Sequence, residues 1–329
     1  MTVFQHPPAE AEVRALAQAS ATRVLNVDHE AAWDFFNASL GVDSIVEARS
    51  GKHQLDEYNN PVGGAFDLGK DGAFNGFKVL FALLMSTRQA DYSTKAKPAL
   101  ERKGFEVTVQ TDPNKVATEL ASKKYHICIV VDAIEFKGGA MRDAICAFHT
   151  RGGALFLLSD NKPFYANTNQ ILTKMGQPFQ MSEDNPGQAF VVRPEVLETV
   201  PNVVKTALSK GHFMSDDHPV LTGVATLYEG ETICAPTGGW ERDFVALADG
   251  GLPAGAASDQ RPLVLVSKPS SFQGQGRIVL DTAFTKLYYK FEAGGTARYV
   301  VNACVWLAGV DSILSKMSRF ERFSAPDGF

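Results

Sequence analysis

The sequence predicts an α/β protein with a mostly parallel sheet that carries helices on both faces. From Phe77 to Met175, short apolar segments alternate with helix-compatible segments, and this alternation favours parallel strands joined by right-handed crossovers. Three of the apolar segments are continuous runs, which are typical of strands buried on both faces. The spacing of the first strand–helix pairs favours a three-layer, flavodoxin-like sheet.

Residues 1–76 differ from the rest and are expected to form a helical or extended arm. Asp28–Leu40 has the pattern of a short amphipathic helix with Trp33 and Phe36 on its apolar face. These two side chains either pack onto the main domain or form a docking surface for a protein partner or a second copy of the chain. Gly51–Gly76 is rich in Gly, Asn and Asp, and indicates a loop or a boundary.

The main domain is predicted over residues 77–310, and its first half contains the regular alternation. Ser93 is expected to cap a helix in which Pro98 lies near the first turn, and Asp112 is expected to cap the next one. The pair Gly152-Gly153 suits a left-handed cap at the end of a third helix. In order, the expected strands and helices are Phe77–Met85, Thr94–Lys103, Phe105–Gln110, Pro113–Lys124, Tyr125–Val131, Gly138–Thr150 and Ala154–Leu158, with Asn167 and Thr168 as caps for another helix.

The second half of the domain is less regular. Residues 176–262 are rich in Pro and Gly, and short alternating segments such as Gln188–Val192 predict an inserted antiparallel portion. Two further strands are expected at Pro262–Ser267 and Arg277–Asp281, followed by a last helix over Ala297–Ala308. Residues 311–329 are expected to be a C-terminal tail.

The composition of the chain argues against several classes of partner. The chain has 329 residues, 45% of them hydrophobic, and a net charge of −5 without a long run of Lys or Arg, which argues against nucleic acid or an anionic membrane as the main partner. No apolar stretch reaches the roughly 18–20 residues that span a bilayer, and no signal peptide is visible. The four cysteines lack CxxC spacing, so we interpret them as reduced residues of a cytoplasmic protein.

Polar residues follow the predicted strands at the edge where open parallel sheets bind ligands. Three carboxylates at this edge could bind a divalent cation, hold sugar hydroxyls or act as acid/base groups; alternatively, these residues cap the helices that begin there. No other cofactor is expected. The candidate catalytic residues are Asp132, Asp160 and Asp281, and the candidate ligand-binding residues are Ser86, Thr87, Ser159, Asp160, Asn161, Asp281, Thr282 and Tyr288.

Two other clusters have both a chemical and a structural interpretation. His212, Asp216, Asp217 and His218 are weak candidates for metal ligands, and the same residues suit a structural turn. Cys146 and His149 are three residues apart on a predicted helix and could form a nucleophilic pair, but the apolar context of Cys146 favours a core position.

Several segments together resemble the class I glutamine-amidotransferase-like fold, within it most closely the branch of ThuA-like proteins and the GIFT domain of an intraflagellar-transport subunit. The segments are Tyr125–Asp132, Ala144–Asp160, Asn167–Gly176, Asp217–Gly223 and Arg261–Asp281, with the closing helix to Trp306. The resemblance implies this fold for residues 77–309, and it implies a role in protein assembly or carbohydrate binding.

The chain departs from that family at the position of the nucleophile. Amidotransferases place a reactive Cys after the strand that corresponds to Ala154–Leu158, whereas this chain has Ser159-Asp160-Asn161, and the His-x-Glu of the family is also missing after the last strand. Glutaminase activity is therefore not expected. The sequence predicts a pseudoenzyme that acts as a binding or scaffold protein, with the arm as its docking element; the alternative is a hydrolase or isomerase acting on a carbohydrate-like molecule.

Overall fold

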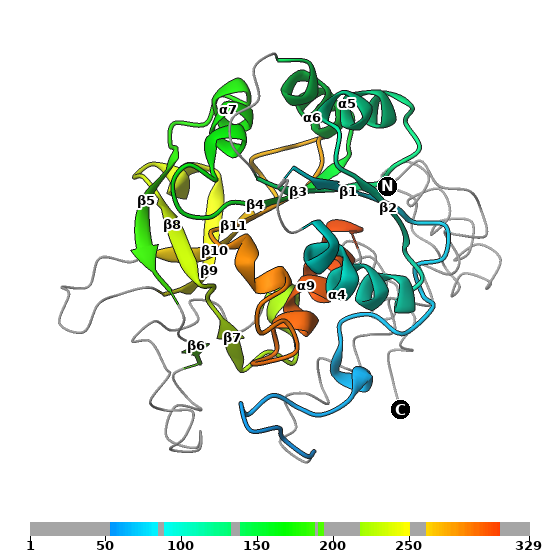
Figure 1. Cartoon of the computed structure of the whole chain (residues 1–329), viewed down its shortest axis with the longest axis vertical. Helices are drawn as coiled ribbons and strands as arrows, with labels where there is room; N and C mark the ends of the chain where they lie inside the picture. The colour runs from blue at the N-terminus through cyan, green and yellow to red at the C-terminus, as the bar shows by residue number, and fades with distance from the viewer. Residues whose placement is uncertain are drawn as a thin grey trace, which may run out of the picture.

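A mixed α/β architecture surrounds a seven-stranded central sheet (Figure 1). The computed structural model describes residues 53–84, 89–132, 139–187, 190–193, 218–250 and 261–309. The sheet has the order β2-β1-β3-β4-β11-β10-β9. Its strands are β1 (Lys78–Leu83), β2 (Glu106–Gln110), β3 (Ile127–Val131), β4 (Ala154–Leu158), β9 (Phe244–Asp249), β10 (Pro262–Ser267) and β11 (Ile278–Asp281).

The first five strands in this order are parallel, and the antiparallel part lies at one edge. β1 pairs in parallel with β2 and β3, and β4 pairs in parallel with β3 and β11. β10 is antiparallel to both of its neighbours, β11 and β9. The sheet is therefore mostly parallel, as the alternation of segments predicts, and its order is consistent with a flavodoxin-like arrangement.

Helices cover both faces of the sheet. Figure 1 shows α5 (Pro113–Ala121), α6 (Ala140–Thr150) and α7 (Ala166–Lys174) on one face, with α4 (Gln89–Arg102) and α9 (Thr296–Leu307) on the other. Alternate residues of a strand point to opposite faces, and the strands accordingly supply two separate cores. Short 3-10 helices occur at Gly64–Phe66, Pro219–Leu221, Trp240–Arg242 and Phe284–Leu287.

The two cores explain why the strands are apolar throughout. Val79 and Phe81 of β1 belong to the core beneath α4 and α9, whereas Leu80 and Ala82 belong to the core beneath α5, α6 and α7. All five residues of β4 are buried, and the strand has the bounds that the sequence predicts. A strand with a core on each face needs apolar residues at every position.

The sequence-based assignment of α4 is wrong at its start. The helix begins at Gln89 instead of Thr94, and Pro98 therefore lies in the helix interior. Tyr92, Ala96 and Leu100 are all buried, and their spacing of four residues forms one continuous stripe that packs on the sheet. This packing extends the helix past Ser93, the expected cap.

Other local predictions are confirmed. Asp112 caps α5 by accepting a hydrogen bond from the backbone N–H of Asn114 at 2.9 Å, and Gly152 has the expected left-handed conformation with φ of 103°. α5 ends at Ala121 instead of Lys124, because Lys123 takes a positive φ of 61° that interrupts the helix.

The irregular region contains two short antiparallel ladders, as expected. β5 (Met181–Pro186) pairs with β8 (Thr232–Pro236), and β6 (Phe190–Val192) pairs with β7 (Thr226–Tyr228). Gln188, in the expected segment Gln188–Val192, lies outside the described residues.

The described part of the N-terminal segment, residues 53–76, packs against the main domain. The Asn60 side chain accepts hydrogen bonds from the backbone N–H groups of Ala225 and Thr226, and Phe74 is buried in the core. The buried ammonium of Lys103 lies 2.8 Å from the carboxylate of Asp67. The predicted helix over residues 28–40 and the predicted tail over residues 311–329 lie outside the described residues.

In the described ranges, none of the helices has the length and apolar character that crossing a bilayer requires.

Candidate functional site at the carboxyl edge of the sheet

The three candidate carboxylates lie at the ends of three neighbouring strands. Asp132 follows β3, Asp160 follows β4 by two residues, and Asp281 ends β11. Backbone hydrogen bonds tie these ends together, from Asp132 N to Leu158 O and from Ser159 N to Asp281 O, each 2.9 Å. All three carboxylates are buried. Ser86 and Thr87, after β1, lie outside the described residues.

Asp132 caps a helix. Its Oδ1 accepts hydrogen bonds from the backbone N–H and the side-chain amide of Asn167, at 3.2 and 2.9 Å, and its Oδ2 accepts one from the backbone N–H of Thr168 at 2.8 Å. A carboxylate at this position also interacts favourably with the dipole of α7. The expectation that Asn167 and Thr168 supply the cap is therefore wrong. α7 begins at Ala166, and the acceptor for its first N–H groups is Asp132, the residue that follows β3.

Asp281 forms a buried ion pair. The ammonium of Lys286 lies 2.9 Å from both carboxylate oxygens, the Tyr299 hydroxyl donates to Oδ2 at 2.7 Å, and the Ala283 N–H donates to Oδ1 at 2.9 Å. Lys286 and Tyr299 are fully buried, and the desolvated tyrosine beside this carboxylate has its pKa raised well above the ordinary value. The positive charge of Lys286 compensates the negative charge of Asp281 inside the protein.

Among the described residues, the hydrogen-bond donors of Asp160 are all neutral. Its Oδ1 accepts from the Thr232 hydroxyl at 2.5 Å and from the backbone N–H of Asn161 at 2.8 Å, and its Oδ2 accepts from the backbone N–H of Thr285 at 3.3 Å. Burial raises the pKa of Asp160 to about 7, although these donors act in the opposite direction. Asp160 is therefore a carboxyl group that can hold its proton near neutral pH.

The Thr232 hydroxyl connects Asp160 to Asn161. Thr232 Oγ1 lies 2.5 Å from Asp160 Oδ1 and 3.0 Å from Asn161 Oδ1, but a hydroxyl has one proton to donate. If Asp160 is protonated, its O–H can donate to Thr232, and Thr232 can donate to Asn161. The protonated form of Asp160 thus satisfies both contacts.

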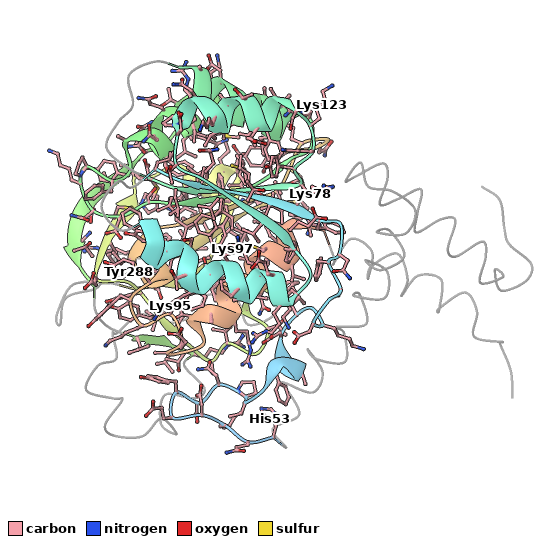
Figure 2. All side chains as sticks on the ribbon, turned by 45° about the vertical axis from the view of Figure 1, so that its right-hand side comes forward. His53, Lys78, Lys95, Lys97, Lys123 and Tyr288 are labelled. Carbon is pink, nitrogen blue, oxygen red and sulfur yellow. The ribbon has the colours of Figure 1, made fainter. Side chains whose placement is uncertain are left out.

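The remaining candidates at this edge differ in their surroundings. The Ser159 hydroxyl is buried and has no hydrogen-bond partner in the part of the chain that the structure describes. Thr282 donates its hydroxyl hydrogen to Leu263 O at 3.2 Å. Tyr288 donates to the carboxylate of Glu231 at 2.7 Å, and its ring contacts Tyr92 of α4. Figure 2 shows Tyr288 on the same side of the molecule as Lys95 of α4.

Metal ligation has no support among the described residues, which contain no group of three or more His, Cys, Asp or Glu side chains arranged to hold a metal ion. His218 caps the short helix at Pro219–Leu221 by accepting from Val220 N at 3.3 Å, and its ring packs against Trp306. His212, Asp216 and Asp217 lie outside the described residues, so their role as ligands stays a prediction.

Cys146 is a core residue with an unreactive thiol. Burial raises its pKa to about 11, and a thiol in that state contributes little thiolate at neutral pH. His149 is also buried, its Nε2 lies 2.7 Å from Gly276 O, and burial lowers its pKa to about 4. All four cysteines are free and buried.

Sequence reasoning missed Thr232, Lys286 and Tyr299, which complete this edge. Lys286 carries a readable signal, because it is the one charged residue in the apolar and aromatic segment Ala283–Tyr289, five positions after Asp281. Thr232 and Tyr299 carry none, because their contacts join distant parts of the sequence.

No protein-family model matches the chain, and no curated protein matches it. Among solved structures, one similar chain is described as the mmIFT52 N-terminal domain: it is 12% identical, with a TM-score of 0.49, over 70% of this chain and 96% of that one. Another is a ThuA-like protein from Parabacteroides merdae, 12% identical, with a TM-score of 0.45, over 71% of this chain and 91% of that one.

Proposed function

We propose that the chain is a non-catalytic binding or scaffold protein with a flavodoxin-like, amidotransferase-like domain. The observation that carries this proposal is the internal use of the strand-end carboxylates. Asp132 caps α7, Asp281 is paired with Lys286, and Asp160 accepts hydrogen bonds from Thr232, Asn161 and Thr285. Groups that are buried and engaged in this way stabilise the fold and are not presented to a substrate.

The position of the family nucleophile supports the same proposal. Ser159 and Asp160 follow β4, where an amidotransferase has its cysteine, and neither can supply a thiolate. The cysteines of the chain are buried elsewhere, and burial raises the thiol pKa of Cys128 to about 12 and that of Cys146 to about 11. We therefore do not propose that the chain hydrolyses glutamine.

The N-terminal arm is the element that we propose for docking a protein partner, which includes a second copy of the chain. In its described part, Leu55 and Val62 are 46% and 47% exposed, beside a β-bridge between Leu55 and Pro61. Asn60 fixes this segment to the domain. Two apolar side chains held at the surface give a protein partner a surface to cover.

Removal of residues 1–52 is expected to abolish assembly. Residues 53–76 must be kept, because Phe74 and Asp67 pack into the domain. Light scattering should give a mass above one copy for the full chain and the mass of one copy for the truncated chain. The double substitution Leu55→Ser and Val62→Ser should weaken assembly, whereas Val245→Ser, at another exposed apolar position, should not. Equal masses for the full and truncated chains would contradict the proposal.

One observation favours the alternative, a hydrolase or isomerase acting on a carbohydrate-like molecule. Asp160 is a buried carboxyl group with a pKa of about 7, and the neighbouring Ser159 hydroxyl has no partner among the described residues. A carboxyl group that is protonated near neutral pH can act as a general acid. This alternative requires a ligand whose binding depends on Asp160.

A further inference from the structure

Lys290 has a backbone conformation that lysine rarely adopts. Its φ is 51°, in the left-handed region, and a residue other than glycine is strained there. Lys290 lies in the loop between the short helix Phe284–Leu287 and α9.

The Lys290 ammonium lies against three aromatic rings. Its Nζ is 5.3 Å from the ring centroid of Phe190, 5.3 Å from that of Tyr228 and 5.7 Å from that of Tyr289. All three distances are within the roughly 6 Å over which a cation is attracted to an aromatic face. We call Phe190, Tyr228 and Tyr289 the aromatic cage.

The cage is assembled from separate parts of the fold. Phe190 and Tyr228 are partners across the antiparallel ladder of β6 and β7 (Figure 1), so their rings lie 5.3 Å apart. Tyr289 forms the third side, 6.0 Å from Tyr228, and Tyr58 packs behind Phe190 at 4.8 Å. The loop passes so close to Phe190 that a Cβ on Gly294 would lie 2.5 Å from its ring.

The chemistry of the cage suits a cation without N–H groups. In the described ranges, no carboxylate pairs with the Lys290 ammonium and no acceptor is hydrogen-bonded to it. A primary ammonium is strongly hydrated and loses hydrogen bonds to water in such a place, whereas a quaternary ammonium has none to lose. Phe190 and Tyr228 are buried and Tyr289 is 42% exposed, so the Tyr289 side is the one open to solvent.

The electrostatic surroundings also favour a cation. Burial, together with the nearby carboxylates of Glu231 and Glu229, raises the pKa of Tyr228. The same carboxylates produce a negative potential around the cage, which attracts positive charge.

We propose that the aromatic cage is a binding site for a quaternary ammonium group, as found in choline-like molecules and in trimethylated lysine, and that Lys290 occupies the site until such a group displaces it. None of the three rings of the cage belongs to the candidate residues of the carboxyl edge, and the proposal does not rest on the proposed function.

Calorimetric titration of the full chain with choline tests the proposal, with 3,3-dimethylbutan-1-ol as the neutral analogue of the same shape. Lys290→Gly removes the competing ammonium, and glycine tolerates the positive φ. The matched control is Lys123→Gly, which removes an exposed lysine with φ of 61°. Lys123 follows α5, on the other face of the sheet from Tyr288 (Figure 2). Choline should bind Lys290→Gly about tenfold more tightly than it binds Lys123→Gly or the unmodified chain.

Two further comparisons make the result specific. The neutral analogue should bind Lys290→Gly at least about tenfold more weakly than choline does. The double variant Lys290→Gly and Tyr289→Ala should bind choline more weakly than Lys290→Gly by a similar factor. Equal affinities for choline and the neutral analogue, or for Lys290→Gly and Lys123→Gly, would overturn the proposal. If Lys290→Gly does not fold, Lys290→Asn replaces it, because asparagine tolerates the left-handed region. A peptide with trimethylated lysine, titrated in parallel, shows whether a protein or a small molecule is the better source of the cation.

Discussion

Lys286→Met is expected to lower the free energy of unfolding by about 3–5 kcal/mol. The substitution keeps the length of the side chain and removes its charge. Asp281 is then a buried carboxylate whose remaining donors among the described residues are Ala283 N and the Tyr299 hydroxyl. The loss of a charge partner inside the protein is costly because no water replaces it. Urea denaturation of the variant and the unmodified chain measures the difference.

Lys95→Met is the matched control for this prediction. Lys95 also forms a 2.9 Å ion pair, with Glu292, but the two side chains are 36% and 69% exposed, and pairs of this kind contribute about 0–1 kcal/mol. Asp281→Asn combined with Lys286→Met should cost less than the sum of the two single changes, because the unpaired charge is gone. If Lys286→Met is no more destabilising than Lys95→Met, the ion pair does not stabilise the carboxyl edge.

Asp160 is expected to make the protein less stable as the pH rises from about 4 to about 7. Its pKa in the folded protein is about 7, above the ordinary value of 3.8. Below the ordinary value, both the folded and the unfolded chain carry the proton, and the contribution to stability is fully present. As the pH rises, the unfolded chain releases its proton first, and the free energy of unfolding falls by up to about 4 kcal/mol before the folded chain titrates.

Asp160→Asn isolates this contribution. His126 and His149 have pKa values lowered to about 4 by burial, so they destabilise the fold as the pH falls from about 6.5 and act in the opposite direction. They are present in both proteins and cancel in the difference between the two stability profiles. That difference should change by about 4 kcal/mol between pH 4 and pH 7. Parallel profiles would mean that Asp160 is already ionised in the folded protein at pH 4.

The strands of the sheet could be predicted from the sequence because the residue pattern that defines each strand is local. The bounds of β4 and β10 follow from uninterrupted apolar runs, and the cap of α5 follows from the Asp112-Pro113 pair. The start of α4 could not be predicted, because Ser93 looks like a cap and only the packing of Tyr92 shows that the helix continues through it.

The surroundings of the candidate residues could not be predicted, because their contacts join residues that are distant in the sequence. Asp132 accepts hydrogen bonds from Asn167, 35 residues later, and Thr232 lies 72 residues from Asp160. The sequence indicates that acidic residues collect at the carboxyl edge, but it does not indicate which of them has a cationic partner. The aromatic cage is hidden for the same reason, since Phe190 and Tyr228 meet only through the pairing of β6 with β7.

A thermal-shift panel of divalent metals, nucleotides, sugars and sugar phosphates, run on the intact chain and on Asp160→Asn, tests the central claim most directly. A ligand at about 100 times its dissociation constant stabilises a protein by roughly 2.7 kcal/mol, which raises the midpoint by several degrees in a chain of this size. If the carboxyl edge stabilises the fold and transforms no substrate, no compound will shift the intact chain without shifting Asp160→Asn equally. A sugar or metal that stabilises the intact chain and fails to stabilise Asp160→Asn would contradict the claim and establish a ligand site at Asp160.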